Sequence, residues 1–148
     1  MVNISFLNLR VVKETSGRYD VCKKIQCPND VFNIAQNVIR AGEYPEENLW
    51  LMTLDAKNNI TGIFTVSTGI LTSSLVHPRE VFKRAVLQNA ASIVICHNHP
   101  SGDITPSQDD VNITKRLYDA GKILGIELLD HIIIGDNSYT SLKERGVI

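Results

Sequence analysis

Residues 92–110, SIVICHNHPSGDITPSQDD, decide how this chain is interpreted. The segment begins with a short apolar run at residues 92–96, which is typical of a central strand. Residues 97–106 follow and are rich in Gly, Pro, Ser and Asp, residue types that favour turns. A helix is expected over about residues 107–124, because apolar residues recur along one side of it and Gly125 follows. The segment therefore predicts a strand, a loop and a helix in succession.

The same kind of pattern places further elements on both sides of this segment. Apolar and β-branched runs predict strands at 3–12, 48–55, 60–68, 126–134 and 139–142, and a further short strand at 73–76. One helix is expected between Asp30, as its N-cap, and Gly42, and another begins at Pro78. Helices mixed with adjacent hairpins predict an α/β (α+β) fold, a mixed β-sheet flanked by helices. We expect one domain over residues 1–148.

Composition narrows the class of protein. The apolar fraction is 43%, the charged fraction 21% and the formal net charge -1, a balance that disfavours a dedicated nucleic-acid binder. The chain begins without a signal-peptide pattern and contains no apolar run long enough to span a membrane. It has three cysteines, an odd number. We therefore expect a cytoplasmic protein without a membrane partner.

The strand end at residue 97 carries the chemistry. His97 and His99 occupy alternate positions of an extended chain, so both imidazoles point to one side while Asn98 faces away. Asp110 follows in the first turn of the expected helix, where the helix dipole favours a carboxylate. Two imidazoles and one carboxylate can hold a catalytic zinc ion and leave a position for water. This pattern predicts a zinc site.

Simpler interpretations exist for each part of this pattern. A His-x-His pair is common by chance, and Pro-Ser-Gly-Asp is ordinary turn chemistry. Ser107 and Asp110 also have the spacing of a capping box, with Asp in place of the usual Glu or Gln. The position of these residues favours the metal site, because polar groups at the end of a buried strand that face a helix N-terminus are where α/β sites form.

The spaced residues His97, His99, Ser107 and Asp110 resemble the JAMM motif of the MPN+ (JAB1/MPN/Mov34) metallohydrolases. Over about residues 28–148 the chain is similar to the bacterial RadC-like JAB domain, most clearly in LVHPREVFKRAVLQNAASIVICHNHPSGDITPSQDDVNITKRL and LLDHIIIGDNSYTSL. The resemblance implies the MPN/JAB (cytidine deaminase-like) architecture. We expect the helix-hairpin-helix region that precedes this domain in longer RadC proteins to be absent.

The resemblance also assigns roles to individual residues. It implies one Zn²⁺ per chain held by His97, His99 and Asp110, and a Ser107 hydroxyl that stabilises the oxyanion at the attacked carbonyl. The family further requires an upstream glutamate as general base.

Glu47, at the start of the expected strand 48–55, fits the place of that glutamate. Glu46 and Glu80 are the alternatives. Their simpler interpretations are a solvated acidic pair for Glu46 and Glu47, and an acid in a helix's first turn for Glu80.

The pair Asp130-His131 has two interpretations: either residue could orient a ligand imidazole from behind, or the pair could be ordinary strand residues. For the whole chain we expect a JAMM-type zinc metallopeptidase that acts on a peptide or protein substrate. A DNA-repair or nucleic-acid accessory protein and a non-catalytic MPN-type scaffold are the alternatives, and a homodimer stays open.

Overall fold

Five strands form one mixed sheet in the computed structural model, which describes residues 1–72 and 76–148. Their order across the sheet is β2-β1-β3-β4-β5. Their bounds are β1 Asn48–Leu54, β2 Ile60–Thr68, β3 Ser92–Asn98, β4 Glu127–Ile134 and β5 Tyr139–Ser141. The expected α+β fold with a mixed sheet flanked by helices is confirmed.

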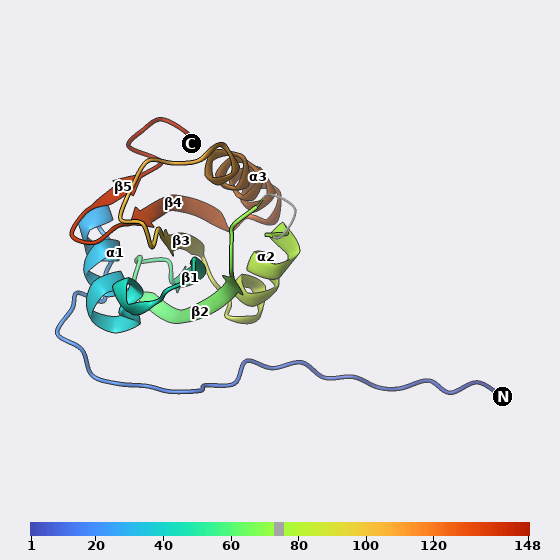
Figure 1. The fold of residues 1–148 in the computed structure, drawn as a ribbon. Coiled ribbons are helices and arrows are strands. Elements are labelled where there is room, and N and C mark those ends of the chain that lie inside the picture. The colour runs from blue at the N-terminus through green and yellow to red at the C-terminus, as the bar shows by residue number, and fades with distance from the viewer. Residues whose placement is uncertain (73–75) are drawn as a thin grey trace.

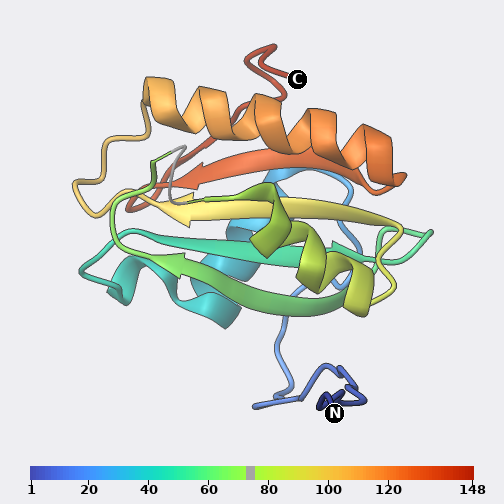
Figure 2. The same cartoon turned by 90° about the vertical axis from the view of Figure 1, so that its right-hand side faces the viewer.

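Helices cover both faces of this sheet (Figures 1 and 2). Helix α1 (Pro28–Ile34) lies on one face and continues into a π-helical turn, η1 (Ala35–Ile39), and a 3-10 turn, η2 (Ala41–Glu43). Helices α2 (Pro78–Leu87) and α3 (Gln108–Leu124) lie together on the other face. The sheet is therefore buried on both sides, and each face has its own apolar cluster.

Strand directions place the loop between β3 and α3 at one end of the sheet. β1 is antiparallel to β2 and to β3, whereas β3 is parallel to β4, with α3 as the crossover between them. β5 returns antiparallel to β4. The carboxyl ends of β3 and β4 therefore meet, and Asn98 is the partner of Ile134 there. Carboxyl ends of parallel strands are where α/β folds build their sites.

Side-chain alternation along β3 sorts its residues between the two faces. Ile93 and Ile95 belong to the cluster beneath α2 and α3, whereas Val94 and Cys96 belong to the cluster beneath α1. His97 follows the odd-numbered residues and points toward α3. Asn98 faces away, as expected, and its Oδ1 accepts the backbone N–H of Asn48 at 2.7 Å.

The strand expected at residues 3–12 is wrong. The structure has an extended arm there that leaves the domain (Figure 1). Its apolar side chains, including Phe6 and Leu7, are exposed. The β-branched and aromatic residue types were strand-like, but a strand also requires a neighbouring edge for its backbone hydrogen bonds, and residues 3–12 pair with none in the described chain.

Helix α1 begins and ends slightly earlier than expected. Cys27 is its N-cap and Pro28 its first residue, while Asp30 accepts the backbone N–H groups of Gln26 and Cys27 from inside the first turn. The helical segment ends at Arg40, which adopts a left-handed conformation with φ 61°. An acid at the third helical position can reach back to the N–H of the N-cap residue, so Asp30 lies inside the first turn and not at the cap.

Most other predicted elements agree with the structure within a residue or two. The short strand expected at 73–76 falls mainly on residues 73–75, which lie outside the described residues. Among the helices of the described chain, none has the length and apolar character to cross a membrane.

Candidate metal centre

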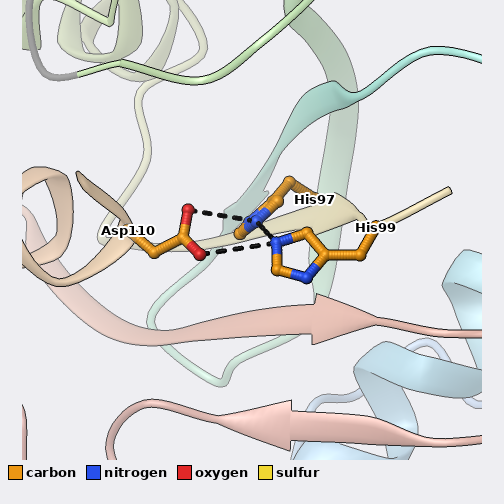
Figure 3. A group of neighbouring side chains, drawn as sticks. All are labelled: His97, His99 and Asp110. Carbon is orange, nitrogen blue, oxygen red and sulfur yellow. Dashed lines mark hydrogen bonds and ion pairs between the residues drawn. The ribbon is translucent and has the colours of Figure 1, made fainter. Parts of the chain in front are cut away.

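Strand β3 and helix α3 bring three ligand-type side chains together (Figure 3). His97 lies near the end of β3, His99 just beyond it, and Asp110 in the first turn of α3. One ligand atom from each lies within 4.8 Å of the others, and in the described residues this is the group that could hold a metal ion. The predicted residues therefore converge as the sequence spacing indicated.

The separations between these atoms suit a tetrahedral ion. Nε2 of His97 lies 3.3 Å from Oδ1 of Asp110, and Nε2 of His99 lies 3.4 Å from Oδ2. The two Nε2 atoms are 2.8 Å apart. Ligand atoms about 2.1 Å from a tetrahedral zinc are about 3.4 Å from one another. Each imidazole thus lies at this separation from a different oxygen of Asp110, and the two Nε2 atoms would have to move apart by about 0.6 Å to share one ion.

The carboxylate and the imidazoles of this cluster shift one another's pKa values. Burial opposes the ionised form of Asp110, but hydrogen bonds from His97 and His99 outweigh it and hold the pKa of that carboxyl well below its usual range. Hydrogen bonding to Asp110 raises the pKa of His99 against the effect of burial. A buried anion beside two imidazoles attracts a cation, which is either a proton or a metal ion.

The loop after β3 holds His99 in place. Nδ1 of His99 donates to the backbone oxygen of Asp103 at 2.6 Å, so Nε2 of His99 is the nitrogen that carries the free lone pair. Gly102 has φ 83°, and a Cβ on Gly135 would lie 2.6 Å from Cγ2 of Ile104 and 2.8 Å from the oxygen of Gly102. The loop is thus packed tightly against the turn between β4 and β5. This close approach requires glycine at position 135.

Asp110 serves two purposes at once. Its Oδ2 accepts the backbone N–H of Ser107 at 2.8 Å, and Oγ of Ser107 accepts the backbone N–H of Asp110 at 3.0 Å. The same carboxylate faces both imidazoles. The capping box and the convergence of the three side chains that could hold a metal, which the sequence presented as alternatives, are therefore compatible. The exposed Ser107 hydroxyl uses only a lone pair in this bond, so its proton can be donated elsewhere.

His131 lies directly behind His97. It is fully buried on β4, and its Nε2 is 2.7 Å from Nδ1 of His97. Its Nδ1 is 2.6 Å from Oγ1 of Thr114. Burial lowers the pKa of His131 well below its usual value, which favours the neutral ring. This contact makes His131 the member of the Asp130-His131 pair that can orient a ligand imidazole.

Asp130 points to the other face of the sheet. Its Oδ2 accepts the hydroxyl of Ser141 at 2.6 Å, and its Oδ1 accepts the backbone N–H groups of His131 and Lys143. It contacts neither imidazole of the cluster through these bonds. Asp130 instead anchors the chain segment after β5.

Glu47 lies at the start of β1 on the side of the cluster. Its carboxylate accepts the backbone N–H of Leu71 at 3.1 Å, and its charge contributes, after hydrogen bonding to Asp110, to the raised pKa of His99. Glu46 is exposed, and the bonds it makes use its backbone oxygen. Of the two adjacent acids, Glu47 is the one whose charge contributes to the raised pKa of His99.

Glu80, the other alternative, is held elsewhere. Its carboxylate lies 2.7 Å from Nζ of Lys83 and 3.1 Å from Arg84. Hydrogen bonds from Lys83 and then Arg84 lower its pKa. It is an acid in the first turn of α2 that pairs with cations on the same helix, as the simpler interpretation stated.

The sequence analysis missed Thr114. It is fully buried, one helical turn after Asp110 on the face of α3 that packs against the sheet. Its hydroxyl donates to the backbone oxygen of Asp110 at 2.6 Å. A polar residue on the apolar stripe of Ile113 and Leu117 was the signal that could have revealed it.

The fold and this site together define the class of protein. The family model of the RadC-like JAB domain matches residues 25–147, and this chain belongs to that family. It is similar to proteins that carry the family name UPF0758. One, from Clostridium botulinum, is 48% identical over an alignment of 147 residues that covers 96% of this chain and 64% of the relative.

Two other UPF0758 proteins cover less of the chain. The protein from Clostridium acetobutylicum is 52% identical over 125 residues, and that from Desulfitobacterium hafniense is 50% identical over 124 residues. In both, the match covers 84% of this chain and 54% of the relative. The chain thus spans between half and two thirds of the length of these relatives.

Proposed function

We propose that this chain is a zinc-dependent hydrolase of the JAMM type that cleaves peptide or isopeptide bonds. The observation that carries the proposal is the convergence of His97, His99 and Asp110 within 4.8 Å, with Glu47 and Ser107 on neighbouring segments. Membership of the RadC-like JAB family supports it. Zinc at such a site supplies a Lewis acid that brings the pKa of a bound water to about 7.

The protein's own groups have separate tasks in this proposal. The Glu47 carboxylate accepts a proton from the attacking water and returns it to the leaving amine. The Ser107 hydroxyl donates a hydrogen bond to the carbonyl oxygen as negative charge develops on it. The N–H of Leu71 restrains one carboxylate oxygen of Glu47 at 3.1 Å, which orients the base.

Access to the cluster is one-sided. The side chain of His97 is 0% exposed, whereas that of His99 is 13% exposed. A groove of about 310 Å³ borders His99 and is lined by Tyr44, Pro45, Asn98, Pro100, Ile134 and Asp136, among others. The groove meets the candidate centre at His99 alone, because the other proposed site residues are not among its lining residues.

Peptide chemistry is favoured over nucleic-acid chemistry. The formal net charge of the chain is -1, whereas affinity for a phosphate backbone depends on a basic footprint. A salt-titrated DNA-binding assay separates the two. Absence of binding at about 50 mM salt removes the accessory-protein alternative, and tight binding there would favour it.

The proposed activity is tested with zinc-loaded full-length chain and two probe sets. One is a fluorescence-quenched peptide library, and the other carries the same sequences joined through a lysine ε-amine. We expect cleavage of at least one set by wild-type protein and none by Glu47→Gln with equal zinc content. Equal cleavage by both proteins, or none by zinc-loaded wild type across both sets, would contradict the proposal and favour the non-catalytic scaffold.

A further inference from the structure

A row of buried hydrogen bonds connects Asp110 to His97, two of the three residues of the candidate metal centre. It runs from the backbone oxygen of Asp110 to the Thr114 hydroxyl, then to Nδ1 of His131, and from Nε2 of His131 to Nδ1 of His97. The three separations are 2.6, 2.6 and 2.7 Å. Thr114, His131 and His97 are each 0% exposed, so water does not compete for these bonds.

The direction of every proton in this row follows from its first member. A backbone carbonyl can only accept, so the Thr114 hydroxyl spends its one proton on Asp110. Toward His131 the same hydroxyl must then accept, so the proton of His131 sits on Nδ1. The two ring nitrogens of the buried His131 face a hydroxyl and an imidazole, not a carboxylate, and a buried charge without such a partner is costly, so the ring is neutral and carries one N–H. Its Nε2 is therefore an acceptor.

The consequence falls on His97. Because Nε2 of His131 accepts, Nδ1 of His97 is the protonated nitrogen, and its Nε2 lone pair points at His99 and Asp110. Zinc binds the unprotonated nitrogen of a neutral imidazole. The reverse direction of the row would place the proton on Nε2 of His97 and block the ligand position.

We propose that Thr114 and His131 are positioning residues that fix His97 in the tautomer whose Nε2 lone pair faces the metal. His99 obtains the same tautomer from a backbone carbonyl, that of Asp103, which can only accept. His97 is bonded instead to another imidazole, which could act in either direction. Thr114 fixes the direction of the bond between the two imidazoles, because its hydroxyl donates to the backbone carbonyl of Asp110 and must accept from His131. The inference rests on the metal-binding part of the proposed function.

Two variants test Thr114, and a third serves as control. Thr114→Val removes the hydroxyl at nearly constant volume, and Thr114→Ser retains it. Thr53→Val is the matched control, because Thr53 is also fully buried and its hydroxyl bonds Thr61 and Gly62 within the β1–β2 pair. It measures the general cost of removing a buried threonine hydroxyl away from the cluster.

The first measurement is made on metal-free protein. Long-range ¹H–¹⁵N spectra of the imidazoles report which nitrogen of each ring carries the proton. We expect His97 and His131 of the wild type both to be protonated at Nδ1, with the same result for Thr114→Ser. A proton on Nε2 of His131 in the wild type would overturn the proposal, whether or not the valine variant folds.

The second measurement is zinc affinity by competition with a chelator. Loss of the direct partner behind a ligand imidazole typically weakens metal binding about 10–100-fold. Thr114→Val acts one bond further out, through His131, so we expect a change near the lower end, about 10-fold. Thr114→Ser and Thr53→Val should stay close to wild type. Equal affinity of Thr114→Val and wild type would refute the positioning role. Failure of wild type itself to bind zinc would instead refute the proposed function, while the tautomers still decide the direction of the row.

Discussion

Ser107 and Asp110 hold each other across the first turn of α3, each accepting the other's backbone N–H at 3.0 and 2.8 Å. The helix cap thus fixes the carboxylate in the orientation in which it meets both imidazoles. One residue pair begins the helix and also places the third member of the candidate metal centre. Changes at either residue should therefore affect folding and chemistry together, and the two effects need separate measurements.

Ser107→Ala should separate the cap from the ligand set. Loss of an N-cap hydroxyl costs about 1 kcal/mol of stability, and loss of one oxyanion donor lowers turnover about 10²–10³-fold. Zinc content should stay unchanged, because the backbone N–H of Ser107 still donates to Asp110. Chemical denaturation, metal analysis and peptide cleavage measure the three quantities. Ser107→Thr, which keeps a hydroxyl, should restore the stability, and loss of zinc from the alanine variant would contradict this account.

Glu47→Gln should abolish turnover without loss of zinc. The glutamine carbonyl still accepts the N–H of Leu71, so the local structure is preserved, but an amide cannot take up the proton from water. Removal of a general base lowers rates about 10²–10⁴-fold. Glu46→Gln and Glu80→Gln are the matched controls, because their carboxylates lie away from the cluster, and neither should change the rate. A loss confined to Glu80→Gln would identify a different base.

Zinc affinity should fall as the pH is lowered. His99 must lose its proton to bind zinc, and hydrogen bonding to Asp110 raises its pKa above the usual 6.5. Below that raised pKa, each pH unit should weaken binding about tenfold. Asp110 adds little to this dependence, because its pKa is lowered. Chelator competition between about pH 5.5 and 8.5 measures the slope; a flat profile would argue against His99 as a ligand.

The stability of the metal-free protein should depend on His99 in the opposite sense, because protonation of His99 at low pH favours the fold while it opposes zinc binding. The pKa of His99 is higher in the folded protein than the value of 6.5 expected in the unfolded chain, so its protonation stabilises the fold at pH values below 6.5. This contribution is lost as the pH rises through the pKa of His99 in the folded protein. Zinc should therefore raise the melting temperature more at high pH than at low pH. Thermal unfolding with and without zinc checks the sign.

Gly135→Ala should disturb the loop that carries His99. The new Cβ would meet Ile104 at 2.6 Å and the oxygen of Gly102 at 2.8 Å, so the loop must move. Overpacking of this kind costs about 1–3 kcal/mol, and the displaced loop should bind zinc more weakly. Gly42→Ala is the control, since its Cβ would meet only Gln36, at 3.9 Å. Unchanged zinc affinity and stability in Gly135→Ala would show that the loop is not held by this contact.

Local sequence patterns predicted the parts of the fold that depend on neighbouring residues. The strand before His97 and the helix after Ser107 are both present, and Gly125 ends that helix with φ 70°. The spacing of His97, His99 and Asp110 predicted the cluster because an alternating strand followed by a capped helix restricts where these side chains can lie. Family resemblance added Glu47, whose place beside the cluster depends on the β1–β3 pairing.

Tertiary contacts decided what the sequence could not reveal. Residues 3–12 have the β-branched and aromatic residue types of a strand, yet they pair with no strand of the described chain and extend from the domain. Thr114 resembles any helix residue until β4 places His131 2.6 Å from its hydroxyl. Asp130 and His131 are neighbours in sequence, but strand alternation sends them to opposite faces, so only one of them reaches His97.

The metal content of purified protein tests the central claim most directly. Elemental analysis of wild type, His97→Ala and Asp110→Ala, with Thr53→Val as a folding control, measures zinc per chain. We expect about one zinc in the wild type and the control, as for a single three-ligand catalytic site, and almost none in the other two variants. Stoichiometric zinc that persists in both His97→Ala and Asp110→Ala would contradict the account.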